Sequence, residues 1–174
     1  MKQLIWAAAL TAVSAFSAAA GTISLVTPDA TPYVGQMFTI DLVVSGNLDE
    51  ILGFGLDYLV STASIGLQSY MINPVFGADL GLADTKVAAV NFPGSTDAMV
   101  TLVSFHFLAQ SQGVSVFSVF SDLTDPNEGL FSLGSTVDLS QALTIDVQAV
   151  PEPASLGLAA VALAGLAVAL RRRK

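Results

Sequence analysis

Residues 38–45 read Phe38-Thr-Ile-Asp-Leu-Val-Val-Ser45, and this stretch decides the fold. Every second residue from Phe38 to Val44 is apolar, and the residues between them are mostly polar. Apolar residues that recur with a period of two lie on one face of a β-strand, whereas a helix needs a period near 3.6. We therefore predict a half-buried antiparallel strand here.

The same pattern, or a run of β-forming residues, recurs in other segments: 22–26, 54–60, 86–92, 103–107, 114–120 and 143–148. Turn-forming pairs such as Asn73-Pro74 and Pro93-Gly94 separate them. Many short strands between turns predict an all-β, antiparallel jelly-roll sandwich over residues 21–149. The residues predicted to be buried are Phe38, Ile40, Leu42, Leu56, Val103, Phe105, Phe107 and Ile145.

Several of these segments resemble a cohesin domain. Residues 34–46 pass from a glycine into a strand rich in β-branched residues and end in Ser-Gly, and residues 23–28 and 53–58 resemble the flanking strands. Residues 102–109, followed by Gly113, match a later strand in the same order. The resemblance implies a nine-stranded jelly roll, similar also to some carbohydrate-binding modules. It does not imply dockerin binding.

The C-terminal 25 residues, 150–174, predict a membrane anchor. An apolar run of 17 residues, 154–170, follows a Pro-Glu-Pro tripeptide. As a helix it is about 25 Å long, just enough to cross a bilayer core of about 30 Å. A basic cluster favours the cytoplasmic side and forms the membrane stop. The cluster consists of Arg171, Arg172, Arg173 and Lys174.

The same tail resembles the PEP-CTERM sorting signal of exported bacterial proteins. The resemblance rests on three parts in order: the tripeptide Pro151, Glu152 and Pro153, the apolar span and the basic cluster. It implies that an exosortase recognises the tail and cuts near the tripeptide, and that the protein accompanies exopolysaccharide production. An ordinary single-pass anchor with a chance Pro-Glu-Pro is the alternative.

The N-terminal 20 residues predict a secretory signal peptide. Lys2 gives a positive start, residues 4–16 are apolar, and Ala18-Ala19-Ala20 offers a cleavage site. Together, the two ends predict an exported protein. We expect it to be anchored in the inner membrane before processing and to reach the cell surface or extracellular space afterwards.

The exported part is strongly acidic. The whole chain carries a net charge of −8, but residues 21–150 hold one lysine, Lys86, against 13 of the 14 acidic residues. Such a surface repels nucleic acid, which requires positive charge. The chain has no cysteine, so no disulfide supports the exported domain.

Catalytic motifs are sparse, so we predict no enzymatic activity. His106 is the only histidine, and the alternation places it on the face away from Phe105 and Phe107. The exported part contains no arginine, no Gly-x-Ser-x-Gly motif and no glycine-rich phosphate loop. Nothing in the pattern predicts the cleft that a carboxylate pair would need.

One acidic loop is a candidate calcium site. Residues 122–129 gather carboxylate and amide oxygens on a bend that contains proline and glycine. Calcium accepts six to eight oxygens in loose geometry, although the order differs from an EF-hand loop. The predicted ligands are Asp122, Asp125, Asn127 and Glu128. The alternative interpretation is a polar surface loop.

Three functions remain open. The first is a non-enzymatic cell-surface or extracellular-matrix protein, sorted by an exosortase and associated with exopolysaccharide or biofilm. The second is a carbohydrate-binding module for exopolysaccharide. No aromatic strip supports it, because the domain has no tryptophan and only Tyr33, Tyr58 and Tyr70. The third, a hydrolase, is disfavoured by the missing motifs.

Overall fold

The computed structural model describes residues 21–46, 50–82, 85–151 and 163. The predicted signal peptide and nearly all of the predicted membrane helix lie outside these residues. Within the described part, no helix is long and apolar enough to cross a membrane. The elements are β1 (Thr22–Val26), β2 (Met37–Ser45), β3 (Ile51–Val60), β4 (Ile65–Ile72), η1 (Pro74–Phe76), β5 (Lys86–Ser95), β6 (Met99–Ala109), β7 (Gly113–Phe120), β8 (Gly129–Ser132), β9 (Thr136–Val137) and β10 (Gln141–Val147).

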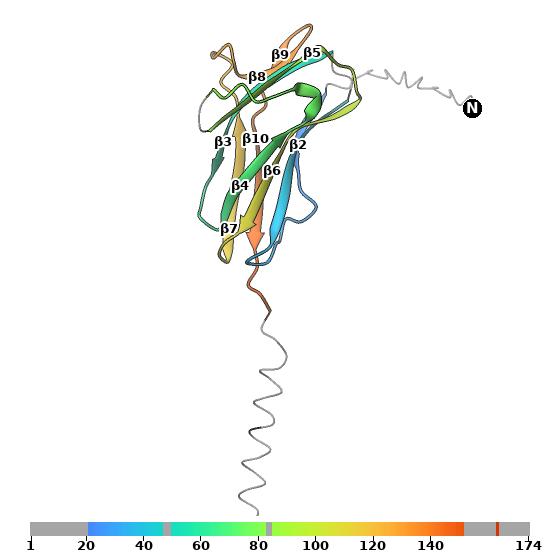
Figure 1. Cartoon of the computed structure of the whole chain (residues 1–174). Coiled ribbons are helices and arrows are strands. Elements are labelled where there is room, and N and C mark those ends of the chain that lie inside the picture. Colours follow the sequence, from blue (N-terminus) through green and yellow to red (C-terminus); the bar gives the residue numbers. More distant parts are fainter. Residues whose placement is uncertain (1–20, 47–49, 83–84, 152–162, 164–174) are drawn as a thin grey trace, which may run out of the picture.

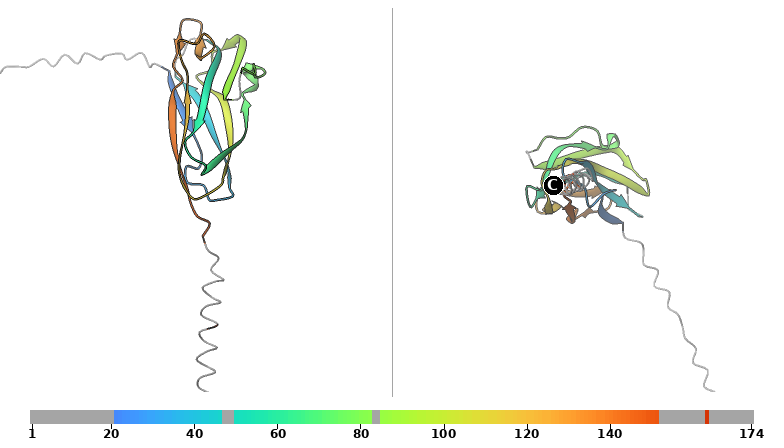
Figure 2. Two further views of the ribbon diagram at one scale, coloured as in Figure 1. Left: turned by 90° about the vertical axis from the view of Figure 1, so that its left-hand side faces the viewer. Right: turned by 90° about the horizontal axis from the view of Figure 1, so that it is seen from below.

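The strands form two antiparallel sheets packed face to face (Figures 1 and 2). The smaller sheet has the order β1-β2-β6-β4. The larger sheet has the order β10-β7-β3-β8-β9, and β5 also pairs with β3. The all-β sandwich is therefore confirmed. The described residues contain ten strands rather than nine, because the chain after β7 makes a short hairpin of β8 and β9 before it enters β10.

The core lies between the two sheets and is rich in aromatic residues. Phe105 and Phe107 of β6 approach Phe117 of β7 from the opposite sheet, with ring centroids 4.9 and 5.0 Å apart. Phe38 stacks on Phe107 at 5.6 Å. All eight residues predicted to be buried are buried. Apolar burial is the main favourable term in folding, so these rings hold the sheets together.

The described chain leaves the sandwich after β10, at the end of the molecule where β7 begins (Figure 1). Gln148 forms a parallel bridge with Tyr33, and the Val34 N–H donates to the Gln148 oxygen at 3.0 Å. This pairing fixes the last residues of the domain before Pro151, which is exposed.

Candidate binding groove on the larger sheet

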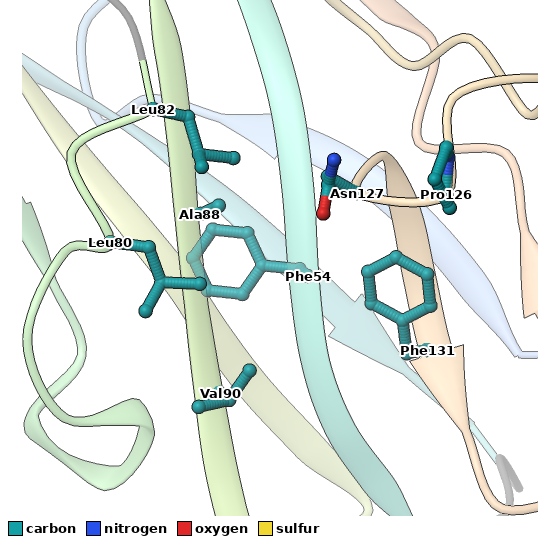
Figure 3. Close-up of a pocket in the computed structure, with 8 residues that line it drawn as sticks. All are labelled: Phe54, Leu80, Leu82, Ala88, Val90, Pro126, Asn127 and Phe131. Carbon is teal, nitrogen blue, oxygen red and sulfur yellow. The ribbon is translucent and has the colours of Figure 1, made fainter.

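An apolar groove lies on the outer face of the larger sheet, above β3 and β5 (Figure 3). Gly53 pairs with Val90 on one side and with Phe131 on the other. Cross-strand partners share a face, and a glycine contributes no side chain to it. The surface is therefore low along β3, between neighbours that carry side chains. The groove has a volume of about 220 Å³ and is lined by Phe54, Leu80, Leu82, Ala88, Val90, Pro126, Asn127 and Phe131.

The wall that carries Leu80 and Leu82 is held by Asp79. One of its carboxylate oxygens accepts a hydrogen bond from the Tyr70 hydroxyl at 2.5 Å, and the other accepts from the Gly81 N–H at 3.1 Å. The hydrogen bond to Asp79 and burial raise the pKa of Tyr70 to about 12. These bonds tie the loop after η1 to β4.

The opposite wall, which carries Pro126 and Asn127, is held by Lys86 of β5. The Lys86 ammonium contacts carboxylate oxygens of Glu128, of Asp125 at 3.1 Å and of Asp57 at 4.0 Å. Glu128 is only 3% exposed, and its other oxygen accepts from the Asp122 N–H at 2.5 Å. A buried carboxylate needs a partner. Lys86 supplies it and fastens loop 122–128 to the sheet.

The charges in this cluster stabilise one another. The hydrogen bond to Glu128, followed by the one to Asp125, raises the pKa of Lys86 above its usual range. The pKa of Asp125 is lowered, first by the Asn127 N–H that donates to it and then by Lys86. Lys86 is the only lysine or arginine in residues 21–151. The one lysine of this strongly acidic domain is therefore paired with carboxylates of this loop.

The predicted calcium ligands all belong to this loop, where donors within the protein already bond to carboxylate oxygens of Asp122, Asp125 and Glu128. Asp122 Oδ1 accepts from the N–H and the hydroxyl of Thr124, at 2.9 and 2.7 Å. Asp125 Oδ1 accepts from the Asn127 N–H at 2.9 Å. In the described part of the chain, no group of three or more histidine, aspartate or glutamate side chains is arranged to hold a metal ion. Calcium binding stays a prediction, and a calcium ion would have to compete with the Lys86 ammonium for these carboxylates.

The remaining predicted residues lie elsewhere. His106 is on the outer face of the smaller sheet, as predicted, and its Nδ1 lies 3.2 Å from the Thr39 hydroxyl oxygen. Of the processing motif, only Pro151 is described. Glu152, Pro153 and the basic cluster lie outside the described residues. The sequence analysis missed the groove and the role of Lys86, although a lone cation in an acidic domain was a usable signal.

Comparison with known families identifies the C-terminal segment. A family model described as "PEP-CTERM protein-sorting motif" matches residues 149–174. This match confirms the sorting motif that the Pro-Glu-Pro tripeptide, the apolar run and the basic cluster predict. A search of curated proteins found no match.

Comparison with solved structures identifies the fold as cohesin-like. The solution structure of CaCohA2 from Clostridium acetobutylicum is similar at a TM-score of 0.55 and 11% identity, over 73% of this chain and 91% of that one. The cohesin module from a family 33 glycoside hydrolase of Clostridium perfringens ATCC13124 gives 0.53 and 12%, over 75% and 96%. A crystal structure of CaCohA2 in complex with a variant of CaDoc0917 gives 0.52 and 12%, over 73% and 100%.

The fold and the tail together define the class. The chain is a cohesin-like β-sandwich followed by a PEP-CTERM sorting motif. The sorting motif implies export and processing at the membrane by an exosortase, and the fold is one that the chain shares with cohesin modules.

Proposed function

We propose that the protein is an exported, non-enzymatic binding module of the cell surface or extracellular matrix. In this proposal an exosortase sorts the protein, and the protein is associated with exopolysaccharide or biofilm. The observation that carries this proposal is the sorting motif at residues 149–174, directly after the last strand of a single sandwich.

The groove on the larger sheet is the proposed docking surface. Its apolar side chains are unusually accessible, with Leu80 53% and Val90 57% exposed. Phe92, two residues further along β5, is 95% exposed. Residues 21–150 hold 13 acidic residues against one lysine, Lys86, which is already paired with carboxylates. This excess of negative charge favours a partner that carries positive charge. The proposed occupant is a cationic protein segment with apolar side chains.

Processing is tested by changing Pro151 and Glu152 to alanine together. The prolines keep this segment extended, because each fixes φ and disfavours helix just upstream. The double variant should insert in the membrane normally, since the apolar run and basic cluster are unchanged, but should not be released. Mass spectrometry of the C-terminus, with and without the exosortase, measures this. Release as efficient as that of the wild type would make the tail a plain anchor.

Docking is tested with two model peptides on the full chain in micelles. One peptide alternates leucine with lysine and the other alternates leucine with glutamate. Only the lysine peptide should bind, and Val90→Ser should weaken it while Val114→Ser, an exposed valine on β7, should not. Equal effects of the two substitutions would mean that the peptide is attracted by charge alone and that the groove is not a docking surface.

A second candidate function is a carbohydrate-binding module for exopolysaccharide. The observation that favours it is a hollow on the outer face of the smaller sheet, separate from the apolar groove and lined by Met71, Asn73, Pro74, Thr101 and Ser104. Sugars present hydroxyl groups, and the side chains of Asn73, Thr101 and Ser104 offer them polar atoms.

A further inference from the structure

The end of the sandwich from which the chain leaves is nearly free of charged side chains. Four segments form this C-terminal end of the sandwich: the connections 27–36, 61–64 and 110–112, and residues 148–151 after β10 (Figure 1). Asp29 is the only charged residue in these four segments. Its carboxylate accepts hydrogen bonds from Gln36 Nε2 and from the Thr31 N–H, both at 2.9 Å.

The connections at the other end of the sandwich are acidic. Of the described acidic residues, seven lie in them: Glu50, Asp79, Asp97, Asp122, Asp125, Glu128 and Asp138. Lys86 pairs with two of these carboxylates, those of Asp125 and Glu128. The apolar groove lies toward the same end, since the loop before β8 forms one of its walls. Negative charge is therefore concentrated away from the point where the chain leaves the domain.

Exposed apolar side chains surround that point. Tyr33, Met37 and Val150 are 47%, 56% and 61% exposed. Tyr33 forms a bridge with Gln148, and the Gln36 N–H donates to the Tyr33 carbonyl at 2.9 Å. This pairing holds Tyr33 and Met37, which flank one turn, beside the last residues of the domain. The three side chains form an apolar surface at the C-terminal end.

The sequence brings a membrane close to this surface. The Gln148 N–H donates to the Pro32 carbonyl at 2.8 Å, which fixes Gln148 to the sandwich. The predicted membrane span begins six residues later, at Ala154. Six residues extend over about 20 Å at most, and about 5–8 Å of that distance is taken up by the headgroup layer. The C-terminal end therefore lies within about 15 Å of the membrane surface for as long as the tail is uncut.

We infer that Tyr33, Met37 and Val150 rest in the headgroup layer of the membrane while the chain is anchored, with the acidic end and the groove turned away. The inference deepens the membrane stage of the proposed function and rests on it. Tyrosine favours the boundary between membrane and water, because its ring is apolar and its hydroxyl is polar. Three side chains form a weak interface, but the tether keeps lipid at a high effective concentration. The opposite orientation would press carboxylates against anionic headgroups.

The orientation is tested with two fluorescent labels, since a chain without cysteine accepts one label at a chosen position. Gln112→Cys places the label at the C-terminal end, and Ser135→Cys places it on the turn between β8 and β9. Both residues are exposed. The full chain is inserted in vesicles whose lipids carry a nitroxide quencher on the headgroup. The label at residue 112 should lose most of its fluorescence, and the label at residue 135 should lose little.

A longer tether separates docking from mere proximity. An insert of about ten glycine and serine residues between Val150 and Pro151 adds about 17 Å of root-mean-square reach, and quenching at residue 112 should survive it. In this longer chain, Tyr33→Ser together with Met37→Ser should remove most of the quenching.

The matched control combines Met99→Ser with Leu133→Ser. These side chains are 71% and 72% exposed at the other end of the sandwich, so the control should keep the quenching at residue 112. Both double variants should keep the melting temperature of their parent, because all four side chains are exposed.

Three outcomes would overturn the inference. They are equal quenching of the two labels, loss of quenching when the tether is lengthened, or quenching that survives the substitutions at Tyr33 and Met37. The second outcome would mean that the tether alone keeps this end near lipid, and it is also expected if the surface serves the exosortase, which the vesicles do not contain. Flotation of the vesicles separates these results from the proposed function. A chain that floats without quenching contradicts only this inference, whereas a chain that does not float also contradicts the predicted anchor.

Discussion

The backbone oxygen of Asn127 occupies the space that a side chain at Gly55 would need. A Cβ atom on residue 55 would lie 1.8 Å from that oxygen and 2.9 Å from the carbonyl carbon. The loop before β8 therefore rests directly on the backbone of β3, with no side chain between them. A glycine in a strand often marks such a close approach, and here it lets the loop form one wall of the groove.

Gly55→Ala should lift this loop from the sheet. We expect a loss of about 1–3 kcal/mol in the free energy of unfolding, as for other overpacked sites, together with faster amide hydrogen exchange in residues 122–129. Gly66→Ala is the control, since its Cβ would meet only the flexible end of the Gln110 side chain, at 2.4 Å. Unchanged exchange in the loop of the Gly55 variant would contradict this account.

Lys86→Met should destabilise the same loop by a different route. The substitution keeps the aliphatic stem but removes the ammonium group, and it leaves Glu128 buried without its counter-charge. Removing one partner of a buried pair is more harmful than removing both. The double variant Lys86→Met, Glu128→Gln should therefore melt at a higher temperature than Lys86→Met alone. A double variant that melts no higher than the single one would show that Glu128 does not depend on Lys86.

Phe105→Ala tests the core. Phe105 is fully buried and its ring contacts those of Tyr58, Tyr70 and Phe117. The cavity should cost about 3–5 kcal/mol, close to the whole stability of many domains. Urea unfolding measures the loss. Met99→Ala, at a side chain that is 71% exposed, should change stability by less than about 0.5 kcal/mol.

The alternation of apolar and polar residues predicted most strands of this sandwich. The strands that it did not predict were missed for physical reasons that the structure shows. In β4 the register with β6 shifts between Leu67 and Ser69, so one extra residue changes the phase of the pattern. The alternation in the sequence is broken there, although Tyr70 and Ile72 still pack against the core. β8 and β9, of four and two residues, are too short to display a period.

The candidate sites were harder to predict, because they depend on contacts between distant segments. Lys86 and Glu128 are 42 residues apart and meet only because β5 and the loop before β8 both adjoin β3. The PEP-CTERM motif is the opposite case, since its three parts are contiguous and could be read directly from the sequence.

Tyr70→Phe should remove a pH-dependent part of the stability. The pKa of Tyr70 is raised to about 12, from an ordinary value near 10. A group whose pKa is raised by folding stabilises the protein fully below its unfolded value and loses this effect as the pH rises through its folded value. The free energy of unfolding of the wild type should therefore exceed that of Tyr70→Phe below about pH 10, and this difference should disappear between about pH 10 and 12. Urea unfolding of both proteins at pH 8, 10, 11 and 12 measures the difference.

Lys86 also titrates in alkaline solution and contributes to the pH dependence of both proteins. Only the difference in the free energy of unfolding between the wild type and Tyr70→Phe is therefore informative. Lys86 is present in both and cancels if the two sites are independent. The Tyr70→Phe variant should be the less stable protein at pH 8, where its missing hydrogen bond to Asp79 counts in full. A difference that stays constant from pH 8 to 12 would mean that Tyr70 does not titrate in this range.

The last prediction is calcium binding by Asp122, Asp125, Asn127 and Glu128. Because Lys86 contacts two of these residues, a Lys86 variant adds a second test of it. If calcium binds, millimolar Ca²⁺ should raise the melting temperature by mass action, whereas Mg²⁺, which demands stricter geometry, should raise it less. Asp125→Ala should abolish the calcium effect. Because this variant also loses a Lys86 contact, it has to be compared with its own calcium-free form.

Lys86→Met distinguishes a calcium loop from a loop closed only by its own lysine. Without the ammonium group, the carboxylates of Asp125 and Glu128 are free to accept a metal ion in its place. The calcium-induced rise in melting temperature should therefore be larger in Lys86→Met than in the wild type, and calcium should recover part of the stability that the substitution removes. If calcium raises the melting temperature of neither protein, the loop is a polar surface loop whose only cation is Lys86. Lys86→Met leaves Asp125 and Glu128 without their counter-charge, so this variant should bind calcium if the loop can bind it at all.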